Sequence, residues 1–273
     1  VAYPLVERGG VLWTYMGAPE YRPPLPEHEW AMMPPAHRFV SKRIQECNYL
    51  QAMEGGIDSS HVSFLHRYTM SHDPMFLHSK ESHRYNLGDT APQFEVVESD
   101  AGLYIGVRRN TGDGRYYWRI MQWVMPSFTL IPPRGDHPIG GHCWVPIDDE
   151  HCWVFSSNHH VTRPLTQEER DAVERGEGIH APLIPGTYRT VANKDNAYLI
   201  DRKAKGFTTL QVQLLCWQEK LANADGEAPL HDLVDLAMHR AIARKIRREP
   251  KLFNRARRNL ARWIRVKRAC PPP

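Results

Sequence analysis

Apolar and polar residues alternate in six short runs that fill the middle of the chain, between residues 94 and 158. Each run is rich in β-branched and aromatic side chains, which is the pattern of half-buried β-strands. Turn residues separate two pairs of neighbouring runs, Thr-Gly-Asp-Gly at 111–114 and Asp-Asp-Glu at 148–150. Short strands at this regular spacing predict an antiparallel meander. The predicted strands are 94–98, 103–109, 115–124, 128–131, 142–147 and 152–158.

The segments on either side of the meander predict further elements. Residues 3–17, with an apolar and aromatic run after two glycines, predict a strand, and residues 18–35 are expected to be irregular because they carry six prolines. Alternation predicts another strand within 39–49. The capping box Thr-Gln-Glu-Glu at 166–169 predicts a short helix that one of the following glycines ends. A sheet combined with helices predicts an α+β fold.

Composition places the chain among ordinary globular proteins. Its 273 residues are 41% hydrophobic and 24% charged, enough for one large domain with a substantial core. No apolar run reaches the ~18 to 20 residues of a membrane helix, and the first residues are not a signal peptide. We expect a soluble cytoplasmic protein. The five cysteines include no C-x-x-C motif, which argues against a disulfide framework and a zinc knuckle.

A histidine motif between residues 48 and 66 carries the candidate chemistry. It places Asp58 three residues before His61, and His66 five residues after His61. Two neutral imidazoles, completed by a carboxylate from elsewhere, form the three-ligand face used by non-haem iron(II) oxygenases. Residues five apart on a regular helix point about 140° apart, so the two histidines converge only if the helix is distorted or ends between them. Asp58 could hydrogen-bond an imidazole, or it could cap the start of a helix.

Four motifs resemble the catalytic domain of the Rieske-type aromatic-ring-hydroxylating oxygenases, in particular the phthalate dioxygenase-like group. They run from the first residues to Arg202, and the spacing of Asp58, His61 and His66 is specific for that family. The four motifs are ERGGVLWTYMG at 7–17, NYLQAMEGGIDSSH at 48–61, FLHR at 64–67 and NKDNAYLIDR at 193–202.

The resemblance implies a fold and a set of roles. The fold is the helix-grip fold, in which a curved antiparallel sheet packs on a long C-terminal helix, with an apolar substrate cavity between sheet and helices. His61 and His66 would bind a mononuclear Fe(II). Asp58 would bridge to a histidine of a Rieske cluster in a neighbouring subunit and pass electrons inward, which implies a homotrimer. NADH would supply the electrons through a reductase or ferredoxin.

The ligands of the [2Fe-2S] cluster itself are not found in this sequence. A Rieske cluster requires two cysteines and two histidines, arranged in the family as C-x-H and C-x-x-H. Neither motif occurs in the chain. We therefore expect the cluster to be supplied from outside the 273 residues.

The third iron ligand and the substrate anchors are less well marked. The family follows a Phe-Thr-Gly-Ile motif with a Gln-Asp pair whose aspartate binds iron, whereas this chain has Phe-Thr-Thr-Leu at 207–210 and then Gln-Glu. Glu219 is therefore the predicted ligand, with Asp225 and Asp232 as alternatives. The planar fork of an arginine suits an aromatic carboxylate, which makes Arg67 and Arg108 candidate anchors. A surface salt bridge is the alternative role of each.

The C-terminal segment differs in charge from the rest. From Arg240 onward lie 13 of the 35 basic residues and one of the 31 acidic residues, so the net charge is +12 there and −8 before it. We divide the chain into an oxygenase catalytic domain at 1–239 and a basic C-terminal helix and tail at 240–273. The basic segment is interpreted as an amphipathic helix to Glu249 followed by a poorly ordered end, or as an arm for nucleic acid or an anionic membrane. A third interpretation is that the segment after about Arg202 is not a selected sequence, for instance an out-of-frame end.

The sequence therefore predicts a terminal oxygenase catalytic domain. It would use O2 and externally supplied electrons at Fe(II) to hydroxylate an aromatic substrate, including a carboxylated one, or to demethylate an aryl ether. The alternative is a non-enzymatic helix-grip domain that binds aromatic ligands. A nucleic-acid-binding protein is a third reading that rests on the basic segment alone.

Overall fold

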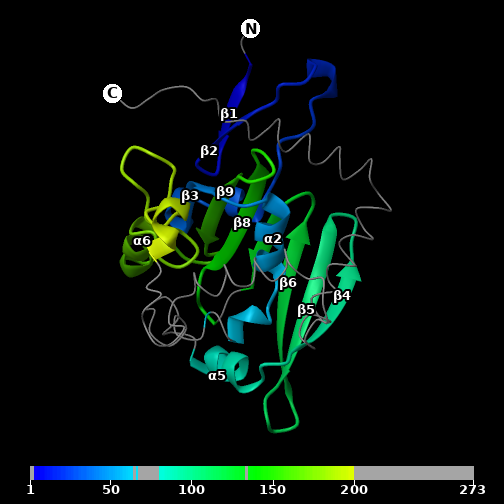
Figure 1. Cartoon of the computed structure of the whole chain (residues 1–273). Helices are drawn as coiled ribbons and strands as arrows, with labels where there is room; N and C mark the ends of the chain where they lie inside the picture. Colours follow the sequence, from blue (N-terminus) through cyan, green and yellow to red (C-terminus); the bar gives the residue numbers. More distant parts are fainter. Residues whose placement is uncertain (1–2, 64–65, 67–79, 133–134, 200–273) are drawn as a thin grey trace.

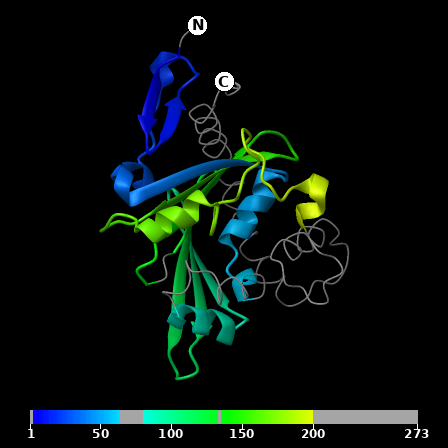
Figure 2. The ribbon, with the colours of Figure 1, turned by 90° about the vertical axis from the view of Figure 1, so that its left-hand side faces the viewer.

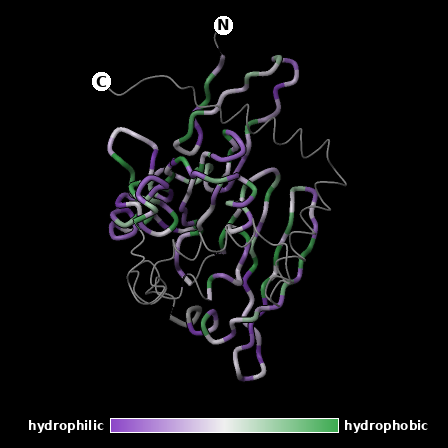
Figure 3. The backbone as a smooth tube through the Cα atoms, in the orientation of Figure 1, coloured by the Kyte–Doolittle hydropathy of each residue, from purple (hydrophilic) through white to green (hydrophobic). Residues whose placement is uncertain are grey.

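A seven-stranded antiparallel sheet forms the centre of the molecule, in a computed structural model that describes residues 3–63, 66, 80–132 and 135–199 (Figure 1). The strand order is β3-β9-β8-β7-β6-β5-β4. Hydrophobic and hydrophilic residues alternate along its strands (Figure 3). The meander from β4 to β9 is confirmed, with both predicted turns. The strands are β3 (Arg38–Gln45), β4 (Gln93–Glu98), β5 (Gly102–Asn110), β6 (Tyr116–Val124), β7 (Phe128–Ile131), β8 (Ile139–Pro146) and β9 (Cys152–His159).

The strand expected within 3–17 is a two-stranded hairpin instead. β1 (Leu5–Arg8) and β2 (Val11–Thr14) pair antiparallel around Gly9 and Gly10. Both glycines have positive φ, +72° and +79°, a conformation that L side chains rarely adopt and that reverses the chain in two residues. The two glycines therefore form the turn of the hairpin rather than preceding a single strand.

The hairpin base and a short helix cover one face of the sheet, here called the outer face (Figures 1 and 2). Helix α1 (Glu29–Met32) lies in the segment expected to be irregular, where residues 27–33 are free of proline. Two further one-turn 3-10 helices, η1 (Pro19–Tyr21) and η2 (Pro35–His37), begin at prolines. The outer core contains Val11, Trp13, Tyr15, Trp30, Ala31, Phe128, Cys143, Val145 and Phe155.

Helix α2 (Tyr49–Ile57) packs on the opposite, inner face of the sheet (Figure 1). Asn48 begins it, because its side-chain oxygen accepts a hydrogen bond from the Leu50 backbone N–H at 2.9 Å. A Cβ added at Gly56 would lie 2.9 Å from Trp144 Cζ3 and 3.2 Å from Thr129 Oγ1. The missing side chain therefore allows the last turn of α2 to lie directly on the sheet. The inner core contains Tyr49, Ala52, Met53, Ile57, Leu103, Ile105, Val107, Met121, Trp123, Trp144, Cys152 and Val154.

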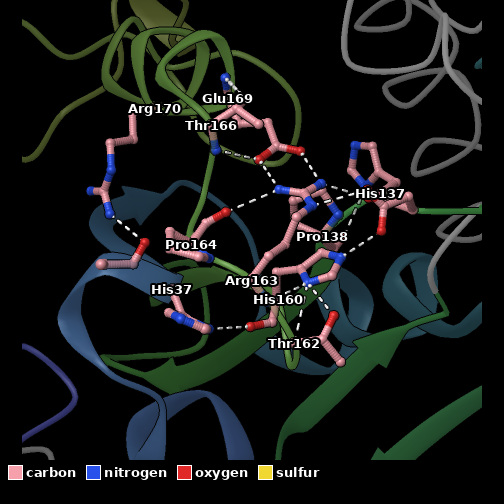
Figure 4. Close-up of polar contacts among 12 residues, drawn as sticks. His37, His137, Pro138, His160, Thr162, Arg163, Pro164, Thr166, Glu169 and Arg170 are labelled. Atoms are coloured by element: carbon pink, nitrogen blue, oxygen red, sulfur yellow. Dashed lines mark hydrogen bonds and ion pairs between the residues drawn. The ribbon is translucent and has the colours of Figure 1, made fainter.

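The predicted capping box is confirmed at the start of α6 (Gln167–Glu174). Thr166 accepts a hydrogen bond from the Glu169 N–H, and the Glu169 carboxylate accepts one from the Thr166 N–H. The same carboxylate receives both ends of the Arg163 guanidinium at 2.9 Å (Figure 4). Arg163 also donates to Asp136 Oδ2, and His160 contacts Asp136 Oδ1 at 3.0 Å. This network joins the start of α6 to the turn before β8.

Three short helices and one extended segment complete the described fold: η3 (His61–Ser63), α5 (Lys80–Gly88), η4 (Lys194–Leu199) and the segment at 183–191. The Ile44 N–H donates to Tyr188 O at 2.8 Å, so the extended segment covers the free edge of β3. None of the described helices is long and apolar enough to cross a membrane. The α+β prediction is confirmed. The long C-terminal helix and the boundary between 239 and 240 lie outside the described residues.

Candidate metal centre

Asp58 stands at the point where α2 ends and the chain turns into η3. It leaves the helical conformation with φ −75° and ψ 126°, and its own N–H still bonds to Glu54 O. Its carboxylate accepts hydrogen bonds from the Ser60 N–H at 2.6 Å and from the His61 N–H at 3.1 Å. Because α2 ends at Ile57, both candidate histidines follow the helix, which removes the 140° divergence expected of a regular helix.

The same carboxylate orients the His61 ring. Asp58 Oδ2 lies 3.0 Å from His61 Nδ1, and the two side chains are 2% and 14% exposed. Since an ionised carboxylate can only accept, His61 donates from Nδ1 and carries its lone pair on Nε2. Asp58 therefore does both things that the sequence left open: it caps the turn and it fixes the imidazole.

The hydrogen bonds keep this buried carboxyl ionised. Burial alone would raise the pKa of Asp58, but hydrogen bonds from His61 and Ser60 outweigh burial and hold the pKa below its ordinary value. The ionised carboxylate accepts the Nδ1 proton of His61 and fixes the tautomer of the ring. His61 is thus prepared to donate its Nε2 lone pair to a cation.

His66 lies beside His61. The ring centroids are 5.0 Å apart and the ring planes are inclined by 52°. The structure therefore brings together three of the predicted site residues, Asp58, His61 and His66. Within the described part of the chain, no group of three His, Cys, Asp or Glu side chains is placed to hold a metal ion. Glu219, with its alternatives Asp225 and Asp232, lies outside the described residues, as does Arg67.

Arg108 is not part of this group. Its guanidinium hydrogen-bonds to Gln93 and lies 4.3 Å from the Tyr116 ring centroid, on the outer face of the sheet. Side chains alternate along a strand, so the apolar residues at 103, 105 and 107 that pack against α2 put Arg108 on the other face. The structure separates this candidate anchor from His61.

The next residue, Arg109, faces inward and holds the metal-site loop. It is fully buried, and its Nη2 donates to Ser59 O at 2.6 Å and its Nε to Asp89 O at 3.2 Å. Burial, and then the nearby charge of Arg119, lower the pKa of Arg109 to about 10. Ser59 directly follows Asp58, so Arg109 ties this turn to β5. The alternation along 103–109 was the signal in the sequence that could have identified it.

Arg119 is a second buried arginine on the inner face. Arg119 lies on β6, opposite Val107 of β5, and is 4% exposed. One Nη2 hydrogen bond reaches Pro132 O at 3.4 Å, while Nε has no hydrogen-bond partner in the described part of the chain. Burial lowers the pKa of Arg119. Thr129 Oγ1 and Trp144 Nε1 on the same face are also buried without partners among the residues that the structure describes. Unpaired buried polar atoms are costly, and a few of them on an apolar surface are typical of a ligand site.

Comparison with known proteins identifies the family of the chain. A family model described as LigXa C-terminal domain like matches residues 14–211. The chain belongs to this family. The phthalate 4,5-dioxygenase oxygenase subunit of Pseudomonas putida is 31% identical over 217 residues, covering 74% of this chain and 47% of that protein. The 3-chlorobenzoate-3,4-dioxygenase oxygenase subunit of Comamonas testosteroni is 33% identical over 156 residues, covering 56% and 35%.

A further relative matches more of the chain, and a solved structure shows the same fold. The 5,5'-dehydrodivanillate O-demethylase oxygenase subunit of Sphingobium is 28% identical over 271 residues, covering 88% of this chain and 57% of that protein. The crystal structure of dicamba monooxygenase bound to 3,6 dichlorosalicylic acid matches with a TM-score of 0.51 at 17% identity, covering 92% and 70%, and shows the fold. The resemblance to Rieske-type oxygenases is thus confirmed for this LigXa C-terminal domain-like chain, which spans about half of the length of its curated relatives.

Proposed function

We propose that this chain is the catalytic domain of a Rieske-type terminal oxygenase. It would use O2 and externally supplied electrons at a mononuclear Fe(II) to hydroxylate an aromatic substrate or to demethylate an aryl ether. The observation that carries this proposal is the buried Asp58 carboxylate that fixes His61 beside His66. Membership of the LigXa C-terminal domain-like family supports it.

The residues present fit a mononuclear iron. His61 would bind through Nε2, because Nδ1 donates to Asp58, and His66 would supply the second imidazole. Glu219 is proposed as the third ligand from the sequence pattern alone. When bound, the iron would supply O2 activation next to the substrate. Asp58 keeps the His61 tautomer fixed, and Arg109 keeps the Asp58 turn in place.

The electron supply is proposed from family membership. A [2Fe-2S] Rieske cluster in a neighbouring subunit of a homotrimer would receive electrons from NADH through a reductase or ferredoxin and pass them through Asp58. Within the single chain, the Asp58 carboxylate is 2% exposed and bonded to His61 and Ser60. Its positioning role therefore rests on contacts within this chain, and its bridging role rests on the family resemblance.

The buried arginines of the inner face support a carboxylated aromatic substrate. Two relatives are named for 3-chlorobenzoate and phthalate, which are aromatic carboxylates. Arg119 Nε has no partner among the described residues, and Arg119 faces the same side of the sheet as α2, whereas Arg108 faces the other side. We propose Arg119 as the carboxylate anchor in place of Arg108, because a desolvated guanidinium binds a carboxylate through charge-assisted hydrogen bonds.

Fe(II) binding under anaerobic conditions tests the metal centre. The intact chain should hold about one Fe(II), as expected for a single three-ligand face. His61→Ala and His66→Ala should lose it, and Glu219→Ala decides the third ligand. His151→Ala is the matched control, because His151 also pairs with an aspartate three residues earlier but is exposed. An intact chain without iron would contradict the proposal.

Ligand binding tests the anchor. Benzoate and benzamide have similar shapes and differ in charge, so only benzoate should respond to the loss of a guanidinium. Arg119→Gln should weaken benzoate binding about 10- to 100-fold, the value of one hydrogen bond to a charged group, and leave benzamide binding nearly unchanged. Arg108→Gln is the control and should change neither. Equal losses for both ligands would refute a carboxylate anchor at Arg119.

The alternative is a helix-grip domain that binds aromatic ligands without chemistry. It is favoured by the metal-ligand count within the described residues, where two imidazoles are present and a third ligand is not placed. This alternative expects benzoate binding by a chain that takes up no Fe(II). The same two measurements therefore separate the two functions.

A further inference from the structure

Two cysteines from distant parts of the sequence meet at the β3 end of the sheet. Gln45 on β3 pairs with Cys152 on β9, and Cys47 follows Gln45 by two residues. Cys47 packs against the inner core cluster that contains Cys152. Both are free thiols. Contact of this kind is the first requirement for a disulfide.

The two thiols have complementary surroundings. Cys47 is half-buried, whereas Cys152 is fully buried. The neighbouring Cys152 side chain lowers the pKa of Cys47, and the positive charges of Lys194 and Arg43 act in the same direction. The interaction with Cys47, followed by burial, raises the pKa of Cys152. Cys47 is therefore the more accessible thiol and the one whose pKa is lowered, whereas Cys152 is enclosed by the core.

A third cysteine provides the contrast. Cys143 is buried on the outer face, and burial raises its pKa to about 12. Its Sγ lies 4.0 Å from Ser127 Oγ. Such a thiol is inert toward oxidants, because the thiolate is the reactive species.

We propose that Cys47 and Cys152 are a peroxide-reactive thiol pair that closes to a disulfide. The Cys47 thiolate attacks one oxygen of hydrogen peroxide, the O–O bond breaks, and hydroxide leaves, so that Cys47 becomes a sulfenic acid. The Cys152 sulfur then attacks the Cys47 sulfur, the S–O bond breaks, and the Cys152 proton leaves with the hydroxyl as water. In sum, two thiols and one peroxide give one disulfide and two waters.

Closure would join β9 to the residue in front of α2. Asn48, the N-cap of α2, follows Cys47 directly and also donates to Asp149 O at 3.1 Å. The far end of α2 carries Asp58, so the cross-link would anchor one end of the element whose other end orients His61. The reaction requires no iron, and its outcome is independent of the proposed oxygenase function.

Peptide mapping of the full iron-free chain tests the pair. Cys216 and Cys270 are replaced by serine, and the folded protein receives one equivalent of hydrogen peroxide. The intact mass should fall by two hydrogen atoms, and dithiothreitol should restore it. Trypsin leaves Cys143 and Cys152 on one peptide, so a second cut after Glu150 distinguishes them. The expected product is a peptide containing Cys47 linked to one containing Cys152.

Single substitutions separate the steps. Cys152→Ser should leave Cys47 as a sulfenic acid that dimedone traps, about ten-fold or more faster than any reaction at Cys143. Cys143→Ser should still give the Cys47–Cys152 link. The proposal would be overturned if Cys47 in the intact pair stays reduced or proceeds to the sulfinic acid without a link. It would also be overturned if urea-unfolded chain links these two cysteines as fast as folded chain.

Discussion

The chain contains the Asp-x-x-His spacing twice, in two different environments. Asp58–His61 and Asp148–His151 both place a carboxylate oxygen 3.0 Å from Nδ1. The first pair is 2% and 14% exposed, and the second is 55% and 38% exposed. Spacing alone could not rank them. The surrounding motif at 48–61 identified the first, and burial gives the physical reason why its hydrogen bond persists against water.

Removal of the buried carboxylate should weaken the metal centre. Without Asp58, the His61 ring loses the partner that fixes its tautomer and its orientation. Asp58→Ala should therefore weaken Fe(II) binding about 10- to 100-fold, in anaerobic titrations with a competing chelator. Asp148→Ala removes the same spacing at the surface and should leave the affinity unchanged. Equal affinities for the two variants would show that the buried contact does not orient a ligand.

A buried histidine pair should make the fold sensitive to acid. His180 bonds to Ser41 and Asn158, and burial lowers its pKa to about 3, while burial holds the pKa of His142 well below its ordinary value. Between pH 3 and 6.5 the unfolded chain binds a proton that folded His180 does not. The contribution of neutral His180 to the free energy of unfolding is therefore fully present above pH 6.5. It decreases as the pH falls from 6.5 toward 3.

Urea unfolding at two pH values isolates this contribution. His180→Gln should reduce the difference in unfolding free energy between about pH 7 and about pH 5 by about 1–2 kcal/mol. The loss of hydrogen bonds lowers stability equally at both pH values, so the difference reports titration alone. An unchanged pH difference in the variant would mean that His180 is protonated in the folded chain.

At the scale of elements, hydrophobic periodicity predicted the strands of the meander better than it predicted long-range strand pairing or the short helix α1. The six strands of the meander follow from alternation and turn residues, because each is paired with a neighbour in sequence. The pairing of β3 with β9 involves residues far apart, and no local pattern encodes it. Helix α1 is only one turn long and is stabilised by the burial of Trp30, a tertiary effect that lies outside any sequence window.

The close approach of α2 to the sheet makes a prediction of unusual sign. Alanine normally stabilises a helix relative to glycine by about 1 kcal/mol. Gly56→Ala should instead destabilise the chain by about 1–3 kcal/mol in urea unfolding, because the new methyl group would overlap the Trp144 ring. Gly88→Ala in α5 is the control, since a Cβ there meets nothing within 4 Å and should be neutral or stabilising. A stabilising Gly56→Ala would mean that α2 does not pack in this way.

At the scale of the whole molecule, the two faces of the sheet have different tasks. The outer face is covered by the hairpin and α1. The inner face carries α2, which leads to His61 and His66, and the buried Arg109 and Arg119. The sequence predicted His61, His66 and Asp58 through a local motif, and the structure brings them together. It could not choose between Arg108, Arg109 and Arg119, because that choice depends on which face of the sheet α2 covers.

The missing cluster motifs make a prediction about activity. Neither C-x-H nor C-x-x-H occurs in these 273 residues, so they do not supply the ligands of the Rieske cluster that would deliver electrons to the proposed iron. The iron-loaded chain with a reductase and NADH should therefore give no repeated turnover of an aromatic substrate, measured as product per chain. A chain joined to a Rieske domain is the positive control. Multiple turnovers by the chain alone would contradict the assigned electron route.

The long-range pairing of β3 with β9 also determines the order in which the site can assemble. Residues 38–45 pair with residues 152–159, more than a hundred positions later. A ribosome therefore completes α2 and the histidine motif well before β5, β6 and β9 exist to receive them. Chains with such distant contacts fold slowly, because the entropy of loop closure is lost before the stabilising contacts form. We infer that the proposed iron site is complete only after the last strand has docked.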